Sequence, residues 1–221
     1  MFKHLITGDI HNRFNWLNTL INKEKPDDIR CAGDFGYWPK FTDKHTFPLS
    51  YIKLGTAKYL KWIDGNHEDF WSLNQRESDE MEPGIIYMPR GSYDVLPDGR
   101  TILYMGGAAS IDKAWRTMGI DWFPEETITQ KDLTDLPDIK VDIIISHTCP
   151  VELVEELQKN YPDKPLEPSN YALTELWNYY NPSLWVFGHW HQYLEKTIRN
   201  TKFYCLSAPE LGDRWWMWLP N

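Results

Sequence analysis

Residues that can bind metal ions occur in five separate groups along this sequence of 221 residues. Each group follows a short apolar segment. In chain order, the groups are Asp9-Ile10-His11, Asp34, Asn66-His67, His147 and His189-Trp190-His191. They include five of the seven histidines, a pattern that histidines scattered through a core would not produce. Mixed imidazole and carboxylate ligands suit Mn, Fe, Zn or Ni, whereas oxygen ligands alone would favour Mg or Ca.

A ligand set of this kind can hold two metal ions. A carboxylate can bridge two cations, which a neutral imidazole cannot do. Two ions about 3.5–4 Å apart can hold both the attacking and the leaving oxygen of an in-line displacement. We therefore predict a phosphoesterase that uses a metal-bound hydroxide. A simpler interpretation treats these residues as structural groups at turns, but it does not explain their joint pattern.

The segments before these groups are predicted to be strands. They are short and apolar, and they cover residues 2–7, 29–32, 60–63, 141–146 and 185–187. Open α/β sheets bind ligands at the carboxyl ends of their strands, so the five groups should converge on one edge. Glycines stand directly before four of the groups, at Gly8, Gly33, Gly65 and Gly188. We expect them to permit the sharp turns that direct the ligands to a common centre.

The remaining apolar patterns predict helices and further strands. Phe14, Leu17, Leu20 and Ile21 recur at helical spacing within residues 13–23. Other helices are predicted over residues 129–136, 151–159 and 171–180. Antiparallel strands are predicted over residues 85–88, 93–96 and 101–105, with a later hairpin over 193–198 and 202–206 and a last strand over 215–219. Residues 106–126 lack a clear period and are expected to form a long loop.

Length and composition narrow the class of protein. A chain of this length can form one well-packed domain, expected here over residues 1–221. The net charge of −9 argues against an extended nucleic-acid surface, although bound metals can still attract an anion locally. The three cysteines have no metal-binding spacing. No apolar run is long enough for a signal peptide or a membrane span, so we expect a cytoplasmic protein with no membrane partner.

The five groups together resemble the motif set of the calcineurin-like metallophosphoesterase superfamily. The motifs are Gly8-Asp9-Ile10-His11, Gly33-Asp34, Gly65-Asn66-His67-Glu68, His147 and Gly188-His189-Trp190-His191, in the family's order. They extend from residue 8 to residue 191, which is nearly the whole chain. The resemblance implies an α/β fold of four layers, α/β/β/α, in which two mixed sheets face each other between flanking helices. It also implies a dimetal site at one edge.

The resemblance implies a role for each motif residue. The first metal ion would be held by Asp9, His11 and His191, both ions by Asp34, and the second ion by Asn66, His147 and His189. His67 would be the catalytic residue and would face the substrate without binding metal. It would donate a proton to the leaving oxygen or stabilise charge on the phosphoryl group. Of the two divalent ions implied, Mn is expected, with Fe, Zn or Ni as alternatives.

The sequence departs from the family's pattern in two places. Members that act on phosphoproteins carry Asp-Arg-Gly after the second motif and an Arg just before Asn-His-Glu. Here residues 33–38 read Gly-Asp-Phe-Gly-Tyr-Trp, and Asp64 stands near the position of the second arginine, just before Asn66-His67-Glu68. The arginines that would bind a phosphoprotein are therefore missing from both places. The Asp that usually supports the catalytic His is absent too. Asp64, Glu68 and Asp69 are candidates to orient His67, on sequence proximity alone.

Three further residues are candidates for substrate contact. Arg116 and Lys113 lie in the 106–126 loop, where either cation could bind a non-bridging phosphate oxygen. The alternative is a solvated loop with no such role. Trp190 lies between two expected ligands and could stack on a nucleobase, but ordinary packing is the favoured interpretation.

The predicted function is metal-dependent hydrolysis of a phosphoester, with phosphodiesters preferred because the phosphoprotein arginines are absent. The substrate could be a nucleotide. Alternatives are a nuclease acting on DNA or RNA ends, a phosphomonoesterase acting on proteins or small molecules, and a metal-binding protein without catalytic activity. The acidic charge argues against the nuclease, and the intact ligand set argues against the inactive protein.

Overall fold

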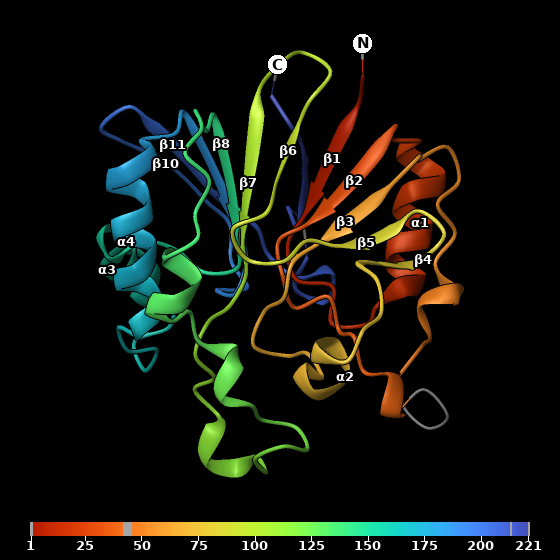
Figure 1. Ribbon diagram of the computed structural model, residues 1–221, viewed down its shortest axis with the longest axis horizontal. Coiled ribbons are helices and arrows are strands. Elements are labelled where there is room, and N and C mark those ends of the chain that lie inside the picture. Colours follow the sequence, from red (N-terminus) through yellow and green to blue (C-terminus); the bar gives the residue numbers. More distant parts are fainter. Residues whose placement is uncertain (1, 42–45, 213, 221) are drawn as a thin grey trace.

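Two mixed β-sheets face each other in the computed structural model, which describes residues 2–41, 46–212 and 214–220 (Figure 1). Among these residues, each sheet has six strands. The first has the order β12-β1-β2-β3-β5-β4, from β1 (His4–Thr7), β2 (Asp28–Cys31), β3 (Leu60–Trp62), β4 (Glu80–Glu82), β5 (Ile85–Tyr87) and β12 (Trp216–Trp218). The second has the order β10-β11-β9-β8-β7-β6, from β6 (Tyr93–Val95), β7 (Thr101–Met105), β8 (Ile143–Ser146), β9 (Leu184–Phe187), β10 (Leu194–Ile198) and β11 (Thr201–Cys205).

Helices cover the outer face of each sheet. α1 (Phe14–Glu24) lies against the first sheet, and α3 (Val151–Gln158) and α4 (Pro168–Tyr180) lie against the second (Figure 1). The short helix α2 (Phe70–Asn74) follows β3. Shorter 3-10 helices occupy the connections, at Pro39–Phe41, Leu49–Tyr51, Lys113–Trp115, Pro124–Glu126, Gln130–Leu133 and Pro209–Leu211. The predicted α/β/β/α sandwich is confirmed. Within the described ranges, none of the helices combines the length and apolar character needed to cross a membrane.

The alternation of side chains along each strand builds the core. In β8, Ile143 and Ile145 lie in the apolar layer between the two sheets, whereas Ile144 packs toward α3 and α4. All three are fully buried. Strands that are covered on both faces are expected to be continuously apolar, which explains the Ile-Ile-Ile run in this strand.

The helix predicted over residues 13–23 is observed as α1. Its buried side chains include Phe14, Leu17 and Ile21, which pack on the first sheet. The helix ends at Lys25, which has a φ of 50° and donates its backbone N–H to the carbonyl of Ile21 at 2.9 Å. A left-handed residue at this point is a common way to end a helix.

The prediction for the middle of the chain was wrong in its pairing. Residues 85–88, 93–96 and 101–105 were expected to be mutually antiparallel. Instead β5 pairs parallel with β3 in the first sheet, and only β6 and β7 form an antiparallel pair, in the second sheet. The chain passes from one sheet to the other between β5 and β6. Periodicity identifies a strand but does not identify its partner, so this crossing left no signal in the sequence.

Smaller differences concern short elements. The helix expected over residues 129–136 is a 3-10 helix, Gln130–Leu133, and Thr129 donates its backbone N–H and its hydroxyl to Asp132 at 2.7 and 2.8 Å. α2 and β4 have no counterpart among the predicted elements. The expectation of one domain over residues 1–221 stays a prediction.

A buried arginine connects the two sheets. Arg30 in β2 is 2% exposed, and it donates to Asp28 at 2.7 Å. It also donates to the hydroxyl of Tyr104 in β7 at 2.9 Å and to Asp94 in β6 at 3.3 Å. Burial would lower the pKa of Arg30, but Tyr104 and the two carboxylates raise it, so the guanidinium stays charged.

We predict that Arg30→Met destabilises the protein by about 3–5 kcal/mol, because Asp28 and Asp94 lose their shared buried partner and keep only His4 and Lys61 as ion-pair partners. Denaturant unfolding followed by tryptophan fluorescence measures the change. Arg199→Met is the matched control, since its side chain is 53% exposed and pairs with Glu152 at 3.7 Å. The control should cost less than about 1 kcal/mol. Equal losses in the two variants would contradict a connecting role for Arg30.

Candidate metal centre

Strands from both sheets bring the predicted ligands to one edge. Asp9 and His11 follow β1, Asp34 follows β2, Asn66 follows β3, His147 follows β8, and His189 and His191 follow β9. Backbone bonds fix the turns against one another, because the N–H groups of Ile10 and His11 both donate to the carbonyl of Asp34, at 3.0 and 2.7 Å. The expected convergence of the five groups on one edge is therefore present in the structure.

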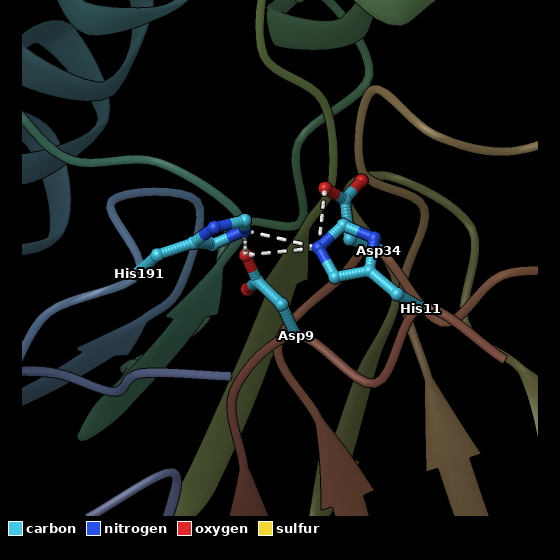
Figure 2. Close-up of side chains that lie close together, drawn as sticks. All are labelled: Asp9, His11, Asp34 and His191. Carbon is cyan, nitrogen blue, oxygen red and sulfur yellow. Dashed lines mark hydrogen bonds and ion pairs between the residues drawn. The ribbon is translucent and has the colours of Figure 1, made fainter. Parts of the chain in front are cut away.

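Four side chains form a first group of possible ligands. Asp9, His11, Asp34 and His191 each offer a ligand atom, and these atoms lie within 4.8 Å of one another (Figure 2). Nε2 of His191 lies 2.9 Å from Asp9 Oδ2 and 2.9 Å from Nε2 of His11. Nε2 of His11 lies 3.7 Å from Asp34 Oδ2. Two carboxylates and two imidazoles thus point into the same small volume.

A second group shares Asp34 with the first. Nδ1 of His147 lies 2.9 Å from the carbonyl oxygen of Ala32, so Nδ1 carries the proton and Nε2 is available as a ligand. That Nε2 lies 3.1 Å from Asn66 Oδ1 and 3.3 Å from Asp34 Oδ1. The His189 ring lies 5.0 Å from the His147 ring, centroid to centroid. One oxygen of Asp34 therefore faces each group.

The backbone is strained at several of these residues. His11, Asp34, His189 and His191 have φ values of 45°, 42°, 66° and 49°. A non-glycine residue held in such a conformation costs about 1–3 kcal/mol, and such residues cluster at functional sites. The rest of the fold must offset this cost to keep the side chains converging.

The glycines before the ligands act mainly by providing space. Of the four that were expected to permit sharp turns, only Gly33 has a positive φ, of 93°. At Gly188, an added Cβ atom would lie 1.9 Å from Asp9 Oδ1. At Gly65, it would lie 2.1 Å from Asp34 Oδ1. At Gly33, Gly65 and Gly188, the side chain of a predicted ligand occupies the volume that a larger residue would need, whereas at Gly8 that volume is taken by the backbone of residues 206 and 207.

Burial and mutual attraction set the charges in the centre. Burial would raise the pKa of Asp34, but His147, His67 and His11 outweigh it and hold the pKa well below its ordinary value. Burial would lower the pKa of His147, but Asp34 and Asp9 raise it to about 10. The carboxylates therefore stay ionised and draw positive charge toward them. With its carboxylates, imidazoles and amide oxygen, this donor set fits divalent cations of the Mn, Fe, Zn or Ni type.

His67 contacts an arginine rather than a carboxylate. The Arg116 NH2 atom lies 2.7 Å from Nδ1 and 2.8 Å from Nε2 of the His67 ring. The pKa of His67 is lowered to about 4. Burial is the largest cause, and the charges of Arg116 and His11 add to it, while Asp34 opposes it. A neutral imidazole has one nitrogen that can accept the N–H of Arg116. Asp112 accepts from Arg116 at 2.8 Å and helps to hold it there.

None of the three acidic residues near His67 in sequence touches its ring. Asp64 is buried and pairs with Arg90 at 2.7 Å. Glu68 accepts two backbone N–H groups, and Asp69 caps α2. Their roles are structural, and the contact with His67 comes from the 106–126 loop.

The other two candidates for substrate contact are Lys113, which lies on the surface, and Trp190, which is buried. Lys113 is exposed, and its Nζ atom lies 4.1 Å from the ring centroid of Trp122. Trp190 is 2% exposed and donates to the hydroxyl of Thr148 at 3.2 Å, so it packs in the core beside α3 and α4 while also lining the cleft. This agrees with the packing interpretation favoured from the sequence.

Two contacts at the centre were missed by sequence reasoning. Asn66 donates to Ser110 at 3.0 Å, and Ser110 in turn donates to the buried carboxylate of Glu126. From another side, Lys164 in the loop between α3 and α4 donates to the carbonyl oxygen of His189. Neither loop has a motif or a period, so the sequence carried no signal that would have placed these residues at the site.

The two-sheet fold and the metal-binding types of residue at its edge together indicate the class of protein, a metallophosphoesterase. A family model of the calcineurin-like phosphoesterases matches residues 2–193, and the chain belongs to this family. The resemblance inferred from the five motifs is confirmed.

Solved structures with the same fold share little sequence with this chain. The protein TT1561 of Thermus thermophilus has a TM-score of 0.58 at 12% identity, over 94% of this chain and 89% of that one. The phosphopantetheinyl hydrolase PptH of Mycobacterium tuberculosis has a TM-score of 0.52 at 15% identity, over 99% and 96%. A search of curated proteins finds no significant match. The similarities show the fold alone.

We predict that Gly188→Ala lowers metal affinity by about 10–100-fold, because the new methyl group displaces Asp9. Titration with Mn followed by calorimetry or electron paramagnetic resonance measures the affinity. Gly106→Ala is the matched control, since its Cβ atom would lie 2.3 Å from Asp64 Oδ1, a carboxylate outside the two groups. Both variants should lose about 1–3 kcal/mol of stability from overpacking. Equal metal affinity in the two variants would contradict the assignment of Asp9 as a ligand.

Proposed function

We propose that this protein hydrolyses phosphoesters with two divalent metal ions and that it prefers phosphodiesters. The observation that carries the proposal is the position of Asp34, whose Oδ2 faces His11 at 3.7 Å and whose Oδ1 faces His147 at 3.3 Å. A carboxylate between two groups of donor atoms is suited to bridging two cations. Mn is the ion we favour, with Fe, Zn or Ni as alternatives.

Each ligand has its place in the proposal. The first ion is assigned to Asp9, His11 and His191, the bridge to Asp34, and the second ion to Asn66, His147 and His189. When bound, two such ions lower the pKa of a water molecule and neutralise charge on the phosphoryl group. The chain orients its own ligands for this chemistry, because the Nδ1–H of His147 is held by the carbonyl of Ala32 and Asn66 is held by Ser110.

His67 and Arg116 are assigned to the substrate. The imidazole of His67 lines the same cleft as Asp34, Asn66 and His191. There it can donate a hydrogen bond to the leaving oxygen or to a phosphoryl oxygen. Arg116 contacts the ring and places a positive charge beside the position where negative charge develops. Lys113 is exposed beside Trp122, so we assign substrate contact in this loop to Arg116.

The choice of ester rests on the surroundings of the centre. The arginines that would bind a phosphoprotein are missing from the motifs, and the cleft measures about 250 Å³, which suits a small ester, including a nucleotide. PptH is named as a phosphopantetheinyl hydrolase and shares this fold, but the fold does not by itself select one kind of ester. A nuclease acting on DNA or RNA ends and a phosphomonoesterase are the alternatives. The buried, unpaired cysteines Cys31, Cys149 and Cys205 fit the reducing cytoplasm we propose.

Removal of metal should abolish activity. We expect chelator-treated protein to lose turnover of an aryl phosphodiester and to recover it better with Mn than with Mg, because imidazole ligands disfavour Mg. Asp34→Asn should lose both metal content and turnover, whereas Asp98→Asn, in an exposed hairpin turn, should lose neither. Active protein without a transition metal by elemental analysis would rule out the proposal. Faster turnover of an aryl monoester or of single-stranded DNA than of the diester would favour one of the alternatives.

Replacing the substrate-facing residues should separate catalysis from metal binding. We expect His67→Ala to lower kcat by about 10²–10⁴-fold with its metal content unchanged. Arg116→Ala should lower kcat/KM by a factor that corresponds to a loss of about 1.5–3 kcal/mol in transition-state stabilisation. This is the range for hydrogen bonds that involve a charged group. Lys113→Ala is the control from the same loop and should retain wild-type kinetics. Loss of metal in His67→Ala would make His67 a ligand, and wild-type kinetics in Arg116→Ala would remove the loop from the site.

A further inference from the structure

A lysine from outside the family motifs lies in the cleft. Lys164 belongs to the connection between α3 and α4, and it lines the cleft together with Asp34, His67 and His191. Its Nζ atom donates to the backbone carbonyl of His189 and lies 5.0 Å from the ring centroid of Trp190. The ammonium group is therefore beside the segment that carries two of the predicted ligands.

The surrounding chain fixes this lysine in place. The backbone N–H of Lys164 donates to the carbonyl of Tyr161 at 3.1 Å, and its own carbonyl accepts from Gln158 at 2.5 Å. Gln192, just beyond the predicted ligands, donates to the carbonyl of Leu157 in α3 at 2.9 Å and accepts from Asn160, so Asn160 ties the connection to the turn after β9. These contacts hold the backbone of the connection, and the bond to His189 holds the end of the side chain, so a bound ligand has less conformational freedom to restrict.

The hydrogen-bonding capacity of Lys164 is only partly used. An ammonium group has three N–H donors, and one of them is satisfied by the carbonyl of His189. Across the described ranges, no carboxylate oxygen lies within 4.0 Å of its Nζ atom, so it has no ion-pair partner there. Its remaining donors and its charge are available to a ligand in the cleft.

Charge balance indicates what kind of ligand this must be. Burial lowers the pKa of Lys164, and the carboxylates of Asp9, Asp34 and Glu167 oppose this effect. When Asp9 and Asp34 are engaged by divalent cations, the local charge turns positive. The ammonium group of Lys164 and such cations would together favour an anion in the cleft. We propose that Lys164 binds a non-bridging oxygen of the scissile phosphoryl group and holds phosphate there after hydrolysis, an inference that rests on the proposed function.

This role differs from that of Arg116. Arg116 contacts His67 and lies on the connection after β7, whereas Lys164 approaches from the connection before α4 and contacts His189. The two cations thus reach the centre from different loops and touch different residues of it. Arg116 acts next to His67, and Lys164 acts on the oxygen that remains with phosphorus.

Inorganic phosphate is the probe for this site. Calorimetric titration of the full chain loaded with Mn should show that Lys164→Gln weakens phosphate binding at least tenfold, because glutamine can still donate to the His189 carbonyl but carries no charge. Lys164→Arg should keep affinity within about threefold of wild type. Lys159→Gln is the matched control, since Lys159 is 65% exposed and pairs with Glu156, and its affinity should not change.

The outcomes separate this inference from the proposed function. If the wild type hydrolyses aryl esters but Lys164→Gln binds phosphate as tightly as the wild type does, Lys164 is a structural tether and the inference fails alone. If no ester is hydrolysed, the proposed function fails, and the phosphate titration still tests Lys164 by itself. An equal loss of affinity in Lys159→Gln would show a general charge effect and would overturn the inference.

Discussion

The carboxylate of Asp34 is the constraint on which the centre depends. It stands at the end of β2 with a φ of 42°, it is 1% exposed, and one of its oxygens faces each group of predicted ligands. Its position requires Gly65 as a neighbour, because a Cβ atom there would lie 2.1 Å from Oδ1. The backbone N–H of His67 donates to the same oxygen at 2.8 Å. The turns after β2 and β3 are therefore built around a single carboxylate.

Two buried, ionised carboxylates also explain why this edge must attract cations. Burying a charge is costly unless it is paired, and the pKa values of Asp9 and Asp34 are lowered by the histidines around them. Asp34 and Asp9 outweigh burial and raise the pKa of His147 to about 10, so a second proton, on its Nε2, would supply the compensating charge as long as no ion takes that position. Divalent cations compensate the same carboxylates more fully. Four of the predicted ligands also have positive φ values, a kind of strain that is typical of functional sites.

The sequence was sufficient to predict that the five groups meet at one edge, because each group follows an apolar strand. A strand end is a local feature, and parallel strands carry such features to one edge whatever their order in the sheet. The sequence could not show that β5 and β6 belong to different sheets, because the apolar pattern of one strand does not identify the strand with which it pairs. The partner of His67 was missed for a similar reason. Arg116 lies 49 residues away in sequence, in a loop without a period, whereas Asp64, Glu68 and Asp69 were proposed on proximity.

The structure thus divides the centre between two kinds of element. Strand ends and the turns between them hold the predicted ligands, where a displacement of about one ångström would disturb several residues at once. The loops after β7 and before α4 supply Arg116 and Lys164. A substitution in these loops does not require a change in the strands. Scaffold elements position the shared chemistry of a family, while loops carry the contacts that distinguish its members. The arginine beside His67 places a positive charge next to the imidazole. The selectivity of this protein among phosphoesters should therefore be sought in these two loops.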